Sequence, residues 1–479
     1  MKSFFIPAVL CLLCCLPLLS LGQKAKDRMI KELEKEKGKY TRIATSIWQY
    51  AEVGYQEEKS SALLQSTLKE EGFEIKAGVA GMPTAFIASY GSGSPVIAVL
   101  AEFDALPGLS QDTMPTRSKI EGKVSGHACG HHLFGTASVA AAITTKNWMQ
   151  KNKIAGTLRL YGTPAEEGGA GKVYLVRDGF FKDVDATIHW HPADRNLANP
   201  GSSLANKSAK FRFYGKSAHA AGAPHKGRSA LDGVEAMNDM VNMLREHVPM
   251  ETRIHYVITR GGDAPNIVPE FAEVYYYIRH PDVETDRQIF ERVVKCAEGA
   301  ALGTETRMEY EVIHGLYNLL PNVTLSRLMH KNLSQVGGFT YTEKEVAFAE
   351  TIRTTLGDKL PEISSTEKVL PFENAVRKGA GSTDVGDVSW VTPTAGLRAA
   401  TWVPGTPAHS WQAVACGGMS IGMKGMMVAA KTLALTAHDL FTDAEVLVKA
   451  QQELKEQAGP DFTYKALLGD RPPALDYRK

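Results

Sequence analysis

The sequence lacks an excess of charge of either sign. Its 479 residues include 54 Lys and Arg against 53 Asp and Glu, whereas nucleic-acid-binding proteins normally carry a basic excess. We therefore expect no nucleic-acid partner. Apolar residues make up 44% and charged residues 22%, which are globular values and exclude a disordered or fibrous chain. At roughly 150 residues per domain, the length predicts two or three domains.

Cysteine is also scarce, with six residues in the whole chain. Three of them lie within the first 22 residues, which leaves Cys129, Cys296 and Cys416 for the rest. An odd and sparse set of this kind implies no framework of disulfide bonds. At least one of these thiols must therefore have another use or simply be buried.

A long apolar run extends from Phe4 to Leu21, behind a single positive charge at Lys2. A charged start, an apolar stretch and a small residue before a polar sequence indicate a secretory signal peptide. A membrane anchor is the first alternative, although Pro7 and Pro17 interrupt the run. A lipoprotein signal is a poorer match, because no small residues precede its cysteines. We expect residues 1–22 to be the signal peptide of a periplasmic or secreted protein, which is attached to a membrane only if the segment stays uncleaved.

Strand and helix patterns alternate after two amphipathic helices, which lie within residues 24–72 and break near Gly54. The run Val96–Leu100 is apolar and partly β-branched, as expected of a central strand that is buried on both faces. Such alternation predicts an α/β fold with a mostly parallel sheet. The expected strands are 73–75, 84–90, 95–101, 158–161 and 186–191, and the expected helix is 136–149.

Residues 207–317 have a different pattern. Strands and helices are expected there in the order β-α-β-β-α-β, which is that of the ferredoxin-like unit. Such a unit starts and ends at neighbouring points in space, as an insertion requires. We therefore predict a catalytic domain formed by residues 23–206 and 318–479, with a lid or dimerisation domain inserted between them. Further helices are expected at 321–336 and 417–437.

Candidate metal ligands follow the predicted strands of the catalytic domain. Cys129 and His131 lie two residues apart in a loop, which allows both to face one metal ion. The pair Glu166-Glu167 follows a second strand, and the segment His189-Trp190-His191 ends a third. Each motif alone occurs often by chance. The carboxyl ends of parallel strands meet at one edge of a sheet. Because these motifs all occur near such strand ends, the sequence predicts a metal site there.

Four segments together resemble one family, the aminoacylase/carboxypeptidase-like dinuclear metallohydrolases. They are GHACGH at 126–131, TPAEEGGAG at 163–171, GKSAHA at 215–220 and GGDAPNIVP at 261–269. Within the family the chain is similar to the amidohydrolase branch, in which Cys replaces the usual bridging Asp. That branch includes hydrolases of indole-acetyl amino acids and of p-aminobenzoyl-glutamate. The segments Trp190–Pro192 and His409–Trp411 are most similar to the latter group.

The resemblance implies two divalent metal ions per subunit and a role for each matching residue. The implied ligands are Cys129, His131, Glu167, His191 and His409, with His189 as the alternative to His191. Glu166 matches the general base. Zinc, manganese or cobalt could each occupy a site of thiolate, imidazole and carboxylate ligands, and the sequence does not choose among them.

The inserted domain also carries residues that match the family. His219 matches the residue that stabilises the oxyanion, often across a homodimer, and Asn266 and Arg279 match positions that hold a substrate carboxylate. A surface ion pair is the alternative role for Arg279. The family-like loop 381–387 is interpreted as scaffold. The chain has His132 where many members of the branch carry Asp, which leaves the substrate within the branch open.

These patterns predict an exported, dinuclear metal-dependent amidohydrolase. Its expected substrate is a small amide with a free carboxylate, of the N-acyl or aminobenzoyl amino acid type. A metallo-exopeptidase or dipeptidase with the same site is the first alternative. A metal-binding scaffold without activity agrees less well with the sequence, because the implied ligands and Glu166 are all present.

Overall fold

The sheet that carries the predicted catalytic residues has six strands in the order β1-β2-β6-β3-β7-β12. The computed structural model describes residues 8–478, with side chains from Gly22 onward. The four strands from β6 to β12 are parallel, and β1 and β2 form an antiparallel edge, so the predicted mostly parallel sheet is confirmed. The strands are β1 (Glu74–Ala77), β2 (Phe86–Ser92), β3 (Val96–Ala101), β6 (Gly156–Gly162), β7 (Ala186–Ala193) and β12 (Thr394–Ala400).

Central strand β3 is buried at all six residues, as its continuous apolar run predicts. Strand β12 was not expected, because its sequence TAGLRAA has neither a β-branched run nor a polar-apolar alternation. It becomes a strand through its parallel pairing with β7, which supplies the hydrogen bonds that its own composition does not favour.

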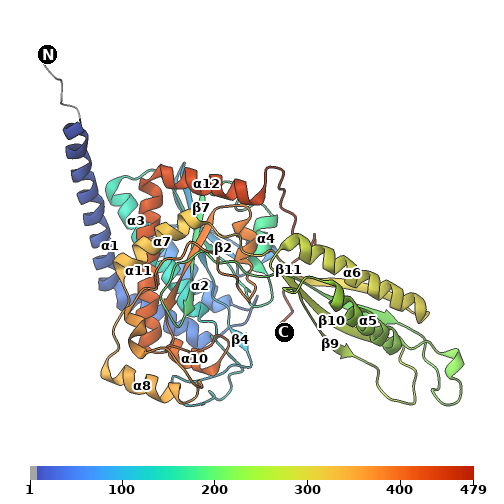
Figure 1. Ribbon diagram of the computed structural model, residues 1–479. Coiled ribbons are helices and arrows are strands. Elements are labelled where there is room, and N and C mark those ends of the chain that lie inside the picture. The colour runs from blue at the N-terminus through green and yellow to red at the C-terminus, as the bar shows by residue number, and fades with distance from the viewer. Residues whose placement is uncertain (1–7, 479) are drawn as a thin grey trace.

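Long helices pack against one another and against this sheet (Figure 1). In α1 (Ala8–Tyr50) the buried residues Met29, Leu33, Tyr40 and Ile47 recur at helical spacing. As predicted, a second helix, α2 (Glu58–Glu70), follows a break. The helix expected at 136–149 begins earlier, at His131, so the last residue of the Cys129-Gly130-His131 motif is the first residue of the helix. The other long helices are α3 (His131–Asn152), α7 (Val323–Val336), α8 (Glu343–Arg353), α11 (Ser420–Thr442) and α12 (Ala444–Ala458).

The inserted unit, which we refer to as the lid, projects sideways from this body (Figure 1). Its sheet is antiparallel in the order β11-β8-β10-β9, and α5 and α6 pack on it around Phe211, Tyr276 and Phe290. The predicted β-α-β-β-α-β order is confirmed. Its elements are β8 (Ala205–Tyr214), α5 (Ala230–Leu244), β9 (Arg253–Arg260), β10 (Phe271–His280), α6 (Val283–Gly303) and β11 (Arg307–Leu316).

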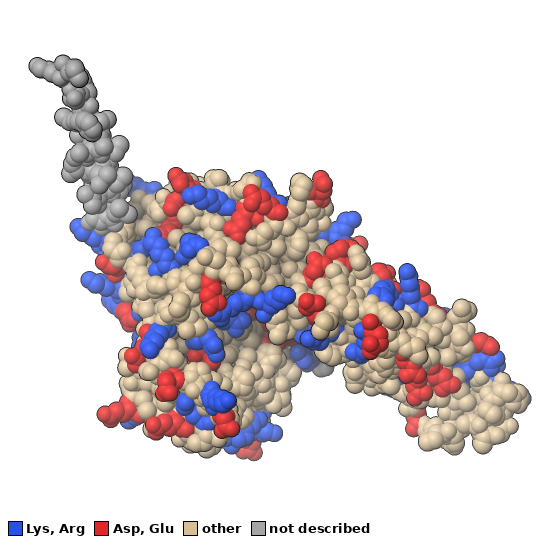
Figure 2. All heavy atoms as spheres, viewed as in Figure 1, with Lys and Arg blue, Asp and Glu red and all other residues tan. Residues whose placement is uncertain are grey.

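Among the described residues, no single helix is long and apolar enough to cross a membrane; α10 (Trp411–Gly417) and α11 pass that test only as a pair, bent by 73°. The first seven residues of the predicted signal peptide lie outside the described part of the chain, and its other residues begin α1. Figure 2 shows positive and negative side chains intermixed over the face in view, which agrees with their nearly equal numbers.

After α12, residues 459–478 contain no long regular element, yet side-chain contacts tie them to the body. We refer to them as the C-terminal segment. Phe462 packs on Trp390 with ring centroids 4.8 Å apart, and Leu467 and Leu468 are buried. The Tyr464 hydroxyl donates a hydrogen bond to the buried Asp387 carboxylate at 2.7 Å.

We expect Asp387 to make folding stability pH-dependent. Burial raises its pKa from 3.8 to about 7. The folded chain therefore keeps a proton that the unfolded chain releases near pH 4, so stability falls as the pH rises from about 4 to about 7. Asp387→Asn keeps a neutral side chain and should remove this decline, worth about 1.4 kcal/mol for each pKa unit of difference. Denaturant midpoints measured from pH 4.5 to 8 check this.

The matched control for this variant is Asp461→Asn, because Asp461 lies in the C-terminal segment that contacts Asp387 through Tyr464 but is itself exposed. It should leave the pH profile of the wild type unchanged. If the stabilities of the wild type and of Asp387→Asn changed with pH in the same way, the Asp387 proton would not contribute to the pH dependence of folding stability.

Candidate metal centre

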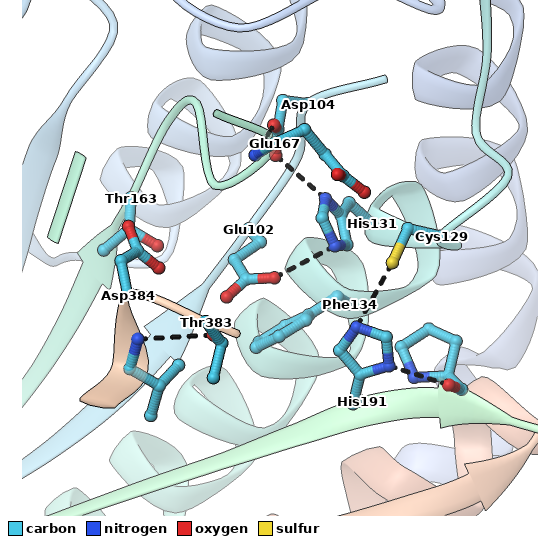
Figure 3. Close-up of polar contacts among 12 residues, drawn as sticks. Glu102, Asp104, Cys129, His131, Phe134, Thr163, Glu167, His191, Thr383 and Asp384 are labelled. Atoms are coloured by element: carbon cyan, nitrogen blue, oxygen red, sulfur yellow. Dashed lines mark hydrogen bonds and ion pairs between the residues drawn. The ribbon is translucent and has the colours of Figure 1, made fainter. Parts of the chain in front are cut away.

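Four of the predicted ligands meet at the carboxyl edge of the parallel strands, namely Cys129, His131, Glu167 and His191 (Figure 3). Strand β3 leads into Glu102 and Asp104, and β6 leads into the loop that carries Glu166 and Glu167. His191 lies in β7, the other neighbour of β3. Adjacent parallel strands bring their carboxyl ends to one place, so residues far apart in the sequence become neighbours.

Two ligand groups share the thiol of Cys129. One consists of Cys129, His131 and His191, and the other of Cys129, Glu167 and His409; within each group the candidate ligand atoms lie within 4.8 Å of one another. Two three-ligand groups with one shared ligand fit a pair of adjacent metal ions. The five residues implied by the resemblance are therefore brought together by the fold.

The donor atoms of these groups fit metal ions because several of them are buried without a hydrogen-bond partner. His131 Nε2 and Glu167 Oε1 are such atoms. The His409 Nε2 atom approaches Glu167 Oε1 to 3.1 Å without forming a hydrogen bond, as two ligands of one ion do. Burial also raises the pKa of the Cys129 thiol above its usual range, and a bound cation offsets that effect by binding the thiolate.

Of the two histidines in β7, the geometry favours His191. Its Nε2 atom lies 3.4 Å from Cys129 Sγ, whereas His189 is absent from the ligand groups of the described residues. His189 instead packs against Gly396 of β12, where an added Cβ would lie 2.5 Å from the imidazole ring. His409 has a backbone φ of +59°, a sparsely populated conformation for a residue with a side chain, as often found at functional sites.

Asp104 orients one residue of each ligand group. Its Oδ1 atom lies 2.8 Å from His131 Nδ1, and its Oδ2 atom accepts a hydrogen bond from the Glu167 backbone at 2.9 Å. A carboxylate behind a histidine ligand fixes the ring and leaves Nε2 for the metal. No role was predicted for Asp104 from the sequence, although its place just after the central strand was a usable signal.

A buried lysine holds Glu102 beside these groups. Lys172 Nζ lies 2.7 Å from both Glu102 Oε1 and Asp384 Oδ1, and all three side chains are buried. The other oxygen of Glu102 is 3.1 Å from His131 Nε2. Loop 381–387, interpreted as scaffold, thus supports the site through Asp384. Lys172 was missed because nothing in its own segment indicates a partner as distant in the sequence as Asp384.

Glu166 lies beside this cluster. One of its carboxylate oxygens groups with ligand atoms of Glu102 and His131. Burial, together with the charges of Glu102 and Glu167, raises the pKa of Glu166 well above its usual value. A carboxylate with a raised pKa can both take a proton from water and return it to a leaving group.

The predicted lid residues do not all come together. His219 and Asn266 are exposed neighbours at the lid tip, where the Ala220 backbone donates to the Asn266 carbonyl at 3.0 Å. Arg279 pairs in register with Asn206, near the body. Strand β10 separates them, because eight residues at about 3.4 Å each span roughly 27 Å. Within one chain, Asn266 and Arg279 therefore lie too far apart to hold a single carboxylate together, and their substrate roles stay predictions.

Arg279 is not in a surface ion pair with any described residue. Its Nε atom is buried without a hydrogen-bond partner, and its guanidinium lies 5.5 Å from the centre of the Tyr277 ring. The Nε donor of Arg279 therefore has no partner among the described residues, which is compatible with a role in substrate binding.

The fold and the paired ligand groups define a dinuclear metallohydrolase, and comparisons with known proteins agree. Residues 205–305 match the family model described as a peptidase dimerisation domain. The chain is 44% identical over 449 residues to one of the subunits of p-aminobenzoyl-glutamate hydrolase from Escherichia coli K12, and the match covers 88% of this chain and 93% of the relative. It is 29% identical to Xaa-Arg dipeptidase of Mus musculus, over 90% of this chain and 92% of the relative.

Solved structures show the same fold. The aminobenzoyl-glutamate utilization protein of Klebsiella pneumoniae superposes with a TM-score of 0.60 at 18% identity, over 86% of this chain and 98% of that one. A dinuclear metal-binding peptidase of the M20 family from Bacillus subtilis gives a TM-score of 0.57 at 18% identity, over 85% and 99%. The chain belongs to the M20 family of metallopeptidases and amidohydrolases, and it is a metal-dependent amidohydrolase.

Proposed function

We propose that the protein hydrolyses the amide bond of an N-acyl or N-aminobenzoyl amino acid with a free carboxylate, and that p-aminobenzoyl-glutamate is the first substrate to test. The observation that carries the proposal is the pair of ligand groups that share Cys129 beside the half-buried Glu166. The 44% identity to p-aminobenzoyl-glutamate hydrolase of Escherichia coli over nearly the whole chain supports this substrate class.

In the proposed mechanism Cys129, His131 and His191 would hold one divalent ion, and Cys129, Glu167 and His409 would hold the other. When bound, such ions polarise the amide carbonyl and acidify water at neutral pH. Glu166 takes the proton of the attacking water and delivers it to the amide nitrogen as the C–N bond breaks. Asp104 keeps His131 and the Glu167 backbone in place. Zinc, manganese and cobalt each suit this ligand set.

The lid completes the proposed site. Arg279 binds the substrate carboxylate, because its planar guanidinium can donate two parallel hydrogen bonds to it. His219 and Asn266 lie at the tip of the lid and act in the active site of a second copy, where His219 stabilises the oxyanion. The edge strand β9 supports a homodimer, since Tyr256, Val257 and Ile258 are all exposed there and an uncovered apolar edge is a pairing surface.

Export is part of the proposal. The packing of α1 supports it, because the helix is tied to the body from Lys26 onward, where Lys26 Nζ contacts Asp439 at 2.6 Å and Asn332 at 2.8 Å. Residues 1–22 can thus be removed without losing these contacts. A mature N-terminus near Gln23 in protein recovered outside the cytoplasm is the expected finding, and an intact N-terminus on membrane-bound protein would contradict it.

The proposal is tested with a substrate panel. Protein freed of metal by a chelator should be inactive, and Zn²⁺, Mn²⁺ or Co²⁺ should restore hydrolysis as about two ions bind per subunit. The panel compares p-aminobenzoyl-glutamate, the same compound with its carboxylates amidated, and an Xaa-Arg dipeptide. The highest kcat/KM is expected for the first. A preference for the dipeptide would support the alternative function, and full activity without metal would exclude the mechanism.

A further inference from the structure

The loop that carries Glu166 and Glu167 is held from one side by buried carboxylates. Asp104 accepts the N–H of Glu167, and Glu57 accepts the N–H of Ala165 at 2.8 Å. Ala165 has a φ of +57°, which costs free energy and persists only where neighbouring contacts enforce it. The shape of this loop therefore depends on contacts from outside it.

The C-terminal segment holds the same loop from the other side. The Tyr477 hydroxyl donates to the Glu167 carbonyl oxygen at 3.0 Å, and the Arg478 guanidinium donates to the same oxygen at 2.9 Å. The N–H of Glu167 is bonded to Asp104, so hydrogen bonds fix both the N–H and the carbonyl of this residue. The Tyr477 ring also packs edge-on against Tyr55 at 5.7 Å, and the Tyr55 hydroxyl donates to the Gly169 carbonyl at 2.7 Å.

Residues that precede Tyr477 and Arg478 in the sequence make further contacts, which keep the C-terminal segment in place. The Arg471 guanidinium donates to the Ile313 carbonyl in β11 at 3.0 Å, and Arg177 donates to the Arg471 carbonyl at 2.7 Å. Gln56 donates to the Leu475 carbonyl at 2.9 Å. Irregular segments near a chain terminus are ordered only when tied down in this way.

We propose that Tyr477 and Arg478 are positioning residues of the metal centre. By fixing the carbonyl of Glu167 they hold its carboxylate toward Cys129 and His409, and they keep Glu166 beside it. The inference rests on the proposed function, because it requires Glu167 to be a metal ligand. Partners that orient a ligand change metal affinity or activity by about 10–100-fold when removed.

The experiment removes both donors in the full-length protein. In the double variant Tyr477→Phe/Arg478→Met, competition with a chelator for Co²⁺ should show metal binding weakened by about 10–100-fold. Hydrogen exchange at residues 165–169 of the metal-free protein should be faster. Each single variant should change less, because the other donor still serves the carbonyl. In the Tyr477→Phe background, Arg478→Lys should retain more affinity than Arg478→Met, since lysine keeps a donor.

The matched control is Tyr464→Phe, which removes a tyrosine hydroxyl from the same segment but away from the loop. It should retain wild-type metal affinity. Wild-type affinity and exchange in the double variant would overturn the inference, and so would an equal loss in Tyr464→Phe. A wild-type protein that bound no divalent ion would overturn the proposed function together with the inference, so the two failures are distinguishable.

Discussion

Replacing Glu166 by Gln should remove most turnover and leave metal binding intact. Glutamine has nearly the same shape but cannot accept the proton of the attacking water. The expected loss in kcat is about 10²–10⁴-fold, the usual contribution of a general base. Elemental analysis of the purified variant should still give the metal content of the wild type, and steady-state kinetics on the best amide substrate measures the loss.

The neighbouring residue provides the control for this prediction. Glu167→Gln removes a charged ligand from the group with Cys129 and His409, so metal content should fall together with kcat. Near-wild-type turnover in Glu166→Gln would show that another group takes the proton. Equal metal loss in both variants would show that the two adjacent carboxylates do not have separate duties.

Mixing two inactive variants should restore activity if His219 acts in the partner's site. His219→Ala removes the oxyanion contact, worth roughly 10²–10³-fold in kcat, and Glu166→Gln removes the base. A mixed dimer then has one complete site, built from Glu166 of one chain and His219 of the other. Random pairing makes half of the dimers mixed, so co-expressed subunits should recover about one quarter of wild-type activity.

The control for this experiment pairs two changes that lie in the same part of the site. Co-expressed Glu166→Gln and Glu167→Gln subunits leave no complete site in a mixed dimer and should stay inactive. If the His219→Ala and Glu166→Gln mixture also stayed inactive although mixed dimers were isolated by two affinity tags, His219 would act within its own chain or not at all.

The strands and helices of the lid could be predicted from sequence because each has a clear pattern of its own. The buried strand β3 was predicted for the same reason. Strand β12 could not be predicted, since its pairing with β7 rather than its composition makes it a strand. The same limit applies to the distance between Asn266 and Arg279. Thirteen residues separate them in the sequence, and the structure shows that most of that interval is one extended strand.

The ligand set came from motif resemblance, whereas the residues that support it did not. Lys172 meets Asp384 across 212 positions, and Tyr477 meets Glu167 across 310. No local pattern indicates such contacts, because either residue could find another partner on the surface. The supporting contacts are therefore visible only after folding, even where the chemistry of the ligands can be read in advance.

The position of the lid within the chain has a consequence for synthesis. Strand β7 precedes the lid, while its neighbour β12 and the candidate ligand His409 follow it. Domains generally fold as units while the chain emerges from the ribosome, and the lid has a core of its own. The lid can therefore fold while the body still exposes the edge of β7. During that interval Cys129 and His191 are present without their full set of partners, so the nascent chain is most exposed to premature metal capture and thiol oxidation between the synthesis of β7 and that of His409.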